Sequence, residues 1–210
     1  AKEEPFAPLV LGINGDLLGG MRAPLEVAAK RVDVAFVNPS AVVTMAYRGK
    51  GFFKRKLPLR ALAVFPSWDR IVFAVSKDLQ IKSLRDIIAN KIPLRISTRS
   101  SGVDNTTHYT VGKILGCYGV SLANFKRWGS TIEELPRPSM PQRVNSILKG
   151  KVNAVFDEGI KSWGQTAIDN GFLYLPIEGE ILDARETLDR QQPPVHRKRR
   201  VARELVPLFG

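Results

Sequence analysis

Strand-like and helix-like runs of apolar residues alternate along positions 8–177, and this alternation predicts an α/β fold. The strand-like runs are nearly continuous in valine, leucine, isoleucine and phenylalanine, which is typical of strands buried on both faces. Strands are predicted at 8–14, 32–38, 59–65, 70–76, 94–98, 125–128, 152–156 and 172–177. Helices are predicted at 24–30, 40–48, 83–90, 104–118, 139–149 and 160–170. We therefore expect mostly parallel sheets covered by helices.

Residues 94–120 carry the most informative pattern, a short strand, a turn of small residues and an amphipathic helix. The turn is formed by Ser100, Ser101 and Gly102, and Ser101 with Asp104 resembles a capping box. A helix N-terminus has unpaired N–H groups and a partial positive charge, so a hydroxyl-rich loop before it can hold a carboxylate or phosphate. The alternative is an ordinary connection between a strand and a helix, which binds nothing.

The helix that follows this turn should pack on a sheet. His108, Val111 and Leu115 fall on one face at helical spacing. Gly112 and Gly116 would allow a close approach, and Gly119 would end the helix. The chain's single cysteine, residue 117, is expected near the buried face.

The length of 210 residues allows one large domain or two lobes of about 100 residues each. The formal net charge of +12 is concentrated in two segments: residues 48–60 carry six bases and no acid, and residues 181–210 carry seven bases and four acids. Phe52 and Phe53 within the first segment could stack on bases, but neither segment matches a nucleic-acid-binding module, so we expect no nucleic-acid partner. The chain begins without a secretory apolar region and holds no apolar run of about 18 residues. We expect a soluble mature product or a fragment.

The chemistry-bearing residues do not form a catalytic pattern. One cysteine and two separated histidines give neither an internal disulfide nor a metal-ligand set. Neither a G-x-S-x-G elbow nor an H-E-x-x-H helix occurs. We therefore expect no enzyme activity, no catalytic residue, no metal and no cofactor.

Two segments share one plan about 120 residues apart: KRVDVAF at 30–36 and GKVNAVF at 150–156. Each has a basic residue, a valine, Asp or Asn, small apolar residues and a phenylalanine. This similarity predicts two related α/β halves. Ligands of such sheets bind beyond the carboxyl ends of the strands.

Four segments in order, VDVAFVNPSAVVTMAYRG, LRALAVFPSWDRIVFAVSKDLQIKSLRDI, LRISTRSSGVDNTTHYTVGKIL and ILKGKVNAVFDEG, resemble type 2 periplasmic solute-binding proteins. They are most similar to the TAXI-type receptors of TRAP transporters and the related thiamine-precursor-binding group. The resemblance covers roughly residues 30–177 and implies two α/β lobes joined by crossing strands near Ser76 and Leu175. The first lobe would span 1–75, the second 76–174, and a return segment with a basic tail 175–210. Only about 18 residues separate the first predicted strand from the second, so the first lobe is expected to be incomplete.

The resemblance also implies the walls of a ligand cleft. The implied residues are those of the turn and of two strand ends, with Trp68 before the crossing strand: Asn38, Pro39, Ser40, Trp68, Ser100, Ser101, Gly102, Asp157 and Glu158. Arg99, beside the turn, could pair with a ligand carboxylate, or it could face solvent at the strand end.

The function implied is that of a monomeric, periplasmic or extracellular solute-binding protein. It would clamp a small organic anion or an amino acid and deliver the ligand to a membrane permease. The alternative is a ligand-sensing effector domain of a transcriptional regulator, which shares the two-lobed fold. A small-molecule enzyme is the weaker third alternative.

Overall fold

The computed structural model describes residues 15–66, 69–101 and 105–178. The chain divides into two units, residues 1–177 and residues 178–210, and all the described helices and strands belong to the first. Its centre is a five-stranded sheet with the strand order β3-β2-β4-β1-β5. The strands are β1 (Val72–Ser76), β2 (Arg95–Arg99), β3 (Thr131–Leu135), β4 (Ala154–Asp157) and β5 (Phe172–Leu175).

The sheet is mixed, and β1 is its reversed strand. β2 pairs in parallel with β3 and with β4, whereas β1 pairs antiparallel with β4 and with β5. The other four strands therefore run in one direction. This arrangement confirms the predicted α/β class; the finer two-lobed organisation, with a boundary near residue 75, stays a prediction.

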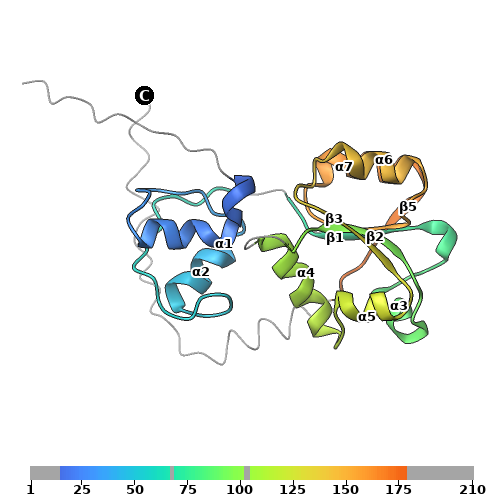
Figure 1. Ribbon diagram of the computed structural model, residues 1–210, viewed down its shortest axis with the longest axis horizontal. Coiled ribbons are helices and arrows are strands. Elements are labelled where there is room, and N and C mark those ends of the chain that lie inside the picture. Colours follow the sequence, from blue (N-terminus) through green and yellow to red (C-terminus); the bar gives the residue numbers. More distant parts are fainter. Residues whose placement is uncertain (1–14, 67–68, 102–104, 179–210) are drawn as a thin grey trace, which may run out of the picture. The chain divides into compact units, whose positions relative to one another are not determined.

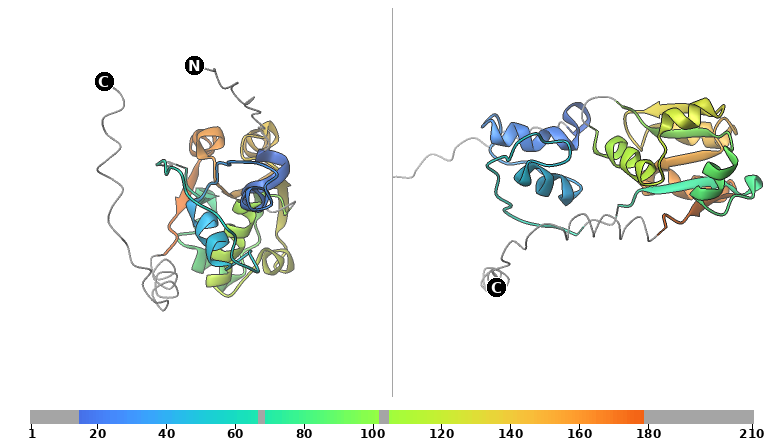
Figure 2. Two further views of the ribbon diagram at one scale, coloured as in Figure 1. Left: turned by 90° about the vertical axis from the view of Figure 1, so that its left-hand side faces the viewer. Right: turned by 90° about the horizontal axis from the view of Figure 1, so that it is seen from below.

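Helices cover both faces of the sheet (Figure 1, and in two further views Figure 2). One face packs against α3 (Leu84–Asn90), α4 (Thr106–Cys117) and α5 (Leu122–Arg127). The other face packs against α6 (Pro141–Leu148) and α7 (Ile160–Asp169). A short 3₁₀ turn, η1 (Lys77–Leu79), follows β1.

Alternation along the strands builds the two core layers. Phe73 and Val75 of β1 face the layer with α3 and α4, while Ala74 between them faces the layer with α7. Phe73 stacks on Phe156 of β4 with ring centroids 4.6 Å apart. Because successive strand side chains point to opposite faces, both faces are apolar and each needs its own helical cover.

A third apolar cluster joins two helices and a loop. α1 (Gly15–Ala28) and α2 (Ser40–Arg48) pack together, and α1 also contacts α4. The loop after α2 adds three apolar side chains to the cluster, whose buried members are Met21, Val42, Ala46, Phe53, Leu57 and Leu59. The basic segment 48–60 is thus anchored by its apolar residues.

The strands predicted at 32–38 and 59–65 are wrong. Residues 32–38 and 59–65 form no strand in the described part of the chain, and large apolar side chains in both segments are exposed. A strand needs a neighbour to accept its N–H groups, and neither segment is hydrogen-bonded to one. Of the two segments that share one plan, only 150–156 contributes to the described sheet. The strand predicted at 8–14 lies outside the described residues.

Several local predictions also need correction. Residues 125–128 belong largely to helix α5, because Ser121 and Asn124 form a capping box at its start. Residues 131–135, where no strand is predicted, form the edge strand β3. The helix predicted at 24–30 begins at residue 15 and contains Pro24.

The central helix α4 also differs from expectation at three points. Its N-cap is Asn105, whose side chain accepts from the N–H groups of Thr107 and His108, and not Ser101. Gly112 and Gly116 face open space, so neither provides a close approach. Cys117 is exposed.

Candidate functional site

The carboxyl ends of four strands meet at one edge of the sheet. Because β1 is reversed, its first residue lies at the same edge: Val72 pairs with Asp157, and Phe73 pairs with Leu175. The chain therefore enters the sheet at β1 beside the point where it leaves after β5 (Figure 1). The predicted turn after β2 and the predicted strand end after β4 both fall at this edge.

A buried ionic cluster lies at this edge of the sheet. The Asp157 carboxylate is fully buried and accepts from Arg143 Nη1 at 2.6 Å and from Arg99 Nη2 at 3.1 Å. Arg143 comes from α6 and also donates to the hydroxyl of Ser97 and the carbonyl of Thr98. Burial lowers the pKa of the Arg143 guanidinium, and the charge of Asp157 opposes that change. The two guanidiniums and the carboxylate thus hold β2, β4 and α6 together.

Glu158 lies at the outer side of this cluster. Its carboxylate accepts from Arg99 Nη2 at 3.4 Å, and its side chain keeps 20% of its surface exposed. Burial raises the pKa of the Glu158 carboxyl, and the charges of Asp69 and Asp157 raise it further, whereas Thr107 and Arg99 lower it. The Thr107 hydroxyl is buried, and although it lies near enough to affect Glu158, it has no partner with hydrogen-bond geometry among the described residues. The Thr107 hydroxyl can therefore still form a hydrogen bond beside Glu158.

The turn after β2 already binds a carboxylate, which belongs to the protein. Ser101 donates to Oε2 of Glu134 from its backbone N–H at 3.0 Å and from its hydroxyl at 3.2 Å. These contacts, led by the backbone N–H, lower the pKa of Glu134, although partial burial opposes them. Glu134 is exposed at the end of β3. The donors that were predicted to hold a ligand carboxylate can thus hold one, and an exposed side chain occupies them.

The predicted facing wall lies near the start of α4. Asn38 and Ser40 are exposed, the Asn38–Pro39 peptide bond is cis, and Pro39 precedes α2 as its N-cap. Gly20 of α1 fits between the two regions, since a Cβ there would lie 3.1 Å from the Asn38 carbonyl and 2.6 Å from Cγ2 of Thr106. The strand end predicted for the first lobe is therefore close to the first turn of α4.

The predicted site residues have different outcomes. Arg99, Asp157 and Glu158 are in direct contact, whereas Ser100 donates its N–H to the carbonyl of Leu135 at 2.9 Å. Trp68 and Gly102 lie outside the described residues. The Nε and Nη2 atoms of Arg99 are engaged by carboxylates of the protein, whereas Nη1 donates to no described residue. The expectation that Arg99 pairs with a ligand carboxylate stays a prediction.

Sequence reasoning missed Arg143, Glu134 and Thr107. A signal existed for Arg143, because it lies four positions before the buried Ile147 and so on the apolar face of α6. A base on that face indicates a buried ion pair. Glu134 gave no such signal, since its role depends on the parallel pairing of β3 with β2.

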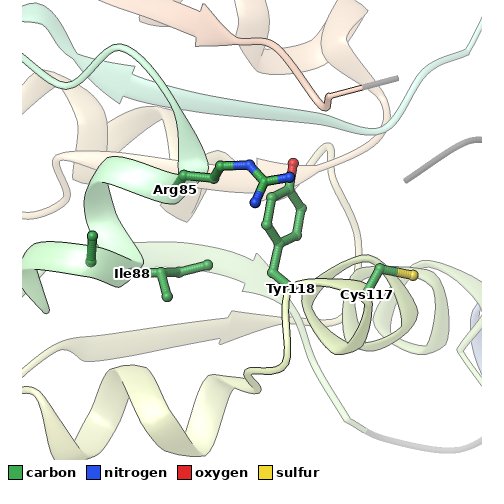
Figure 3. Close-up of a pocket in the computed structure, with 5 residues that line it drawn as sticks. Arg85, Ile88, Cys117 and Tyr118 are labelled. Carbon is green, nitrogen blue, oxygen red and sulfur yellow. The ribbon is translucent and has the colours of Figure 1, made fainter. Parts of the chain in front are cut away.

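Two hollows among the described residues are not lined by the residues of this edge. One, of about 390 Å³, is lined by Arg85, Ile88, Ala89, Cys117 and Tyr118. In it the Arg85 guanidinium lies 5.7 Å from the Tyr118 ring centroid (Figure 3). Another, of about 410 Å³, is polar and is formed largely by α6 together with Glu133.

No group of three metal-ligating side chains occurs within residues 15–66, 69–101 and 105–178. In the same ranges no helix has the length and apolar character needed to cross a membrane. Comparison with known proteins adds no assignment: no protein-family profile matches this chain, and no curated protein matches it.

Proposed function

We propose that this chain is an extracytoplasmic solute-binding protein that holds a small organic anion or an amino acid at the carboxyl edge of its sheet. The observation that carries the proposal is the clustering of Arg99, Glu158 and Thr107 at the edge where the chain enters and leaves the sheet, with Ser101 in the turn two residues after Arg99. Delivery of the ligand to a membrane permease, and a periplasmic location, belong to the same proposal.

The polar groups at this edge are suited to a ligand with both donors and acceptors. The unused Nη1 of Arg99 can donate to a ligand carboxylate. The half-buried Glu158 and the unpartnered hydroxyl of Thr107 can bind a ligand N–H or O–H group. A ligand carboxylate that reached Ser101 would replace the carboxylate of Glu134 with equivalent hydrogen bonds.

The connections of the sheet support a binding role. The start of β1 and the end of β5 lie side by side at this edge, because Phe73 pairs with Leu175, so two connections of the chain meet where the ligand is proposed to bind. Open α/β sheets bind ligands beyond the carboxyl ends of their strands, where loops can be shaped without changing the core. The exposed Asn38–Ser40 segment is the described candidate for the opposite wall.

The test is a ligand screen on the full chain. Thermal unfolding is measured with small carboxylates, amino acids and pyrimidines, and mass spectrometry identifies any compound that co-purifies. We expect at least one compound to raise the melting temperature, since binding only the folded state stabilises it. Ser101→Leu should abolish that shift, because a bulky side chain fills the turn.

Thr131→Leu provides the matched control. Thr131 is an exposed hydroxyl residue at the opposite end of β3, so the same change in chemistry should leave the ligand shift intact. An equal shift in both variants would place the ligand elsewhere. The absence of any stabilising or co-purifying compound would contradict the proposal.

A further inference from the structure

The loop after α2 presents a concentrated positive charge on a fixed backbone. Its N–H at Leu57 donates to the carbonyl of Ala46 at 2.9 Å, and Phe53 and Leu57 are buried. Four bases of the loop are exposed, and their side chains form neither a hydrogen bond nor an ion pair with any described residue: Lys50, Lys54, Arg55 and Lys56. Because no acid lies within residues 48–60, this charge is not neutralised locally.

An exposed apolar surface follows the loop along the chain. Leu62 and Val64 keep 81% and 80% of their surface exposed, and Phe65 is also exposed. The Phe65 ring lies 6.0 Å from that of Phe36, which is 88% exposed and belongs to a second exposed segment with Val34. Contiguous apolar surface of this kind on a folded protein marks an interaction site.

Charge selects among possible occupants of this surface. A second copy of the chain would bring a like charge of +12 against the basic loop, which opposes association. A nucleic acid would satisfy the bases and stack on the phenylalanines, but it would leave Val34, Leu62 and Val64 without apolar partners. An anionic bilayer has negative headgroups at its surface and an acyl boundary just below them. It can therefore pair with the bases of the loop and bury the exposed apolar side chains.

We propose that residues 50–65, together with Val34 and Phe36, form a docking surface for an anionic phospholipid bilayer. The bases contact the headgroups, and the apolar side chains enter the boundary between headgroups and acyl chains. This proposal does not depend on ligand binding at the sheet edge.

The experiment is flotation of the full chain with vesicles of phosphatidylglycerol mixed with phosphatidylcholine, and with vesicles of phosphatidylcholine alone. We expect binding to the anionic vesicles, weakened by added salt. The triple variant Lys54→Ala/Arg55→Ala/Lys56→Ala should reduce the partition coefficient by about 100-fold, on the scale expected for three bases at an anionic surface. Leu62→Ser/Val64→Ser should also reduce it while the net charge stays constant.

A charge-matched control separates this surface from general attraction of a basic protein. Arg127→Ala/Lys149→Ala/Lys151→Ala removes three exposed bases elsewhere and should retain most of the binding. All the substituted residues are exposed, so circular dichroism should show the wild-type fold in every variant. Equal loss in both triple variants, unchanged binding of the Leu62/Val64 variant, or no binding to anionic vesicles would overturn the proposal. Ser101→Leu should bind vesicles like the wild type, which keeps this test separate from the ligand test.

Discussion

Asp157 is the residue on which the sheet edge depends most. Its carboxylate is fully buried and is shared by the guanidiniums of Arg99 and Arg143. A buried ion pair contributes little net stability over a well-packed apolar group, because both partners lose hydration. Removing one member is different, since the remaining charges stay buried without compensation. Here the Asp157 carboxylate is shared by two cations, of which only Arg99 also contacts Glu158, so its loss affects β2, β4 and α6 together.

We predict that Asp157→Asn lowers the free energy of unfolding by about 3–5 kcal/mol. The amide keeps the size of the side chain but leaves Arg99 and Arg143 without their shared counter-charge. Urea unfolding followed by circular dichroism measures the change. Asp169→Asn is the control, because Asp169 is exposed at the end of α7 and its loss should cost only about 0.5 kcal/mol. Similar unfolding midpoints for the two variants would show that the cluster is not a structural centre.

At the scale of the elements, the turn from β4 into α7 is the most constrained connection. Gly159 is its N-cap with φ of 69° in the left-handed region. Its N–H donates to Asp69 Oδ1 at 2.7 Å, which ties the segment before β1 to the end of β4. A Cβ at this position would lie 2.5 Å from two carbon atoms of Pro138. Backbone conformation and packing therefore both require glycine here.

We predict that Gly159→Ala destabilises the protein more than Gly150→Ala does. Gly150 has a φ of 60° and open space around it, so alanine there incurs only the left-handed strain of about 1–2 kcal/mol. Alanine at 159 adds the clash with Pro138, on the order of 1–3 kcal/mol more. Thermal and urea unfolding of the two variants measures the difference. Equal losses would mean that Pro138 moves aside without cost.

Elements with strong local signals were predictable, and those that depend on distant pairing were not. The helix predicted at 83–90 is confirmed as α3, which begins at a capping box of Ser83 and Asp86, and the strand predicted at 152–156 is confirmed as β4. Residues 32–38 have a better strand sequence than β3, yet only β3 finds a neighbour, because β2 lies beside it. The presence of a neighbouring strand, and not the β-propensity of the sequence, therefore decides that β3 is a strand and that residues 32–38 are not. Arg99, Asp157 and Glu158 were predicted as site residues, but the ion pair of Asp157 with Arg143 depends on the tertiary fold.

At the scale of the whole first unit, order is distributed unevenly. The central strands are paired on both sides and covered by helices on both faces. Residues 32–37 and 60–65 lack both kinds of support. Their side chains are mostly exposed, and none of their N–H groups donates to the backbone of a described residue. Local unfolding free energies follow such differences in burial and hydrogen bonding. The protein should therefore combine a stable sheet with two weakly held segments.

Hydrogen exchange of the full chain, read by mass spectrometry of peptic fragments, tests this distribution. We predict the slowest exchange for amides in β1, β2 and β4, where opening requires loss of both core layers. Amides of 32–37 and 60–65 should exchange at least about 100-fold faster, since no intramolecular acceptor in the described chain protects them. Helix α2 is the internal control, because it lies between the two segments in sequence and its amides are hydrogen-bonded within the helix. Protection of 32–37 equal to that of α2 would mean that the segment pairs with a partner strand in solution, and the exposed apolar surface proposed for bilayer docking would then be covered.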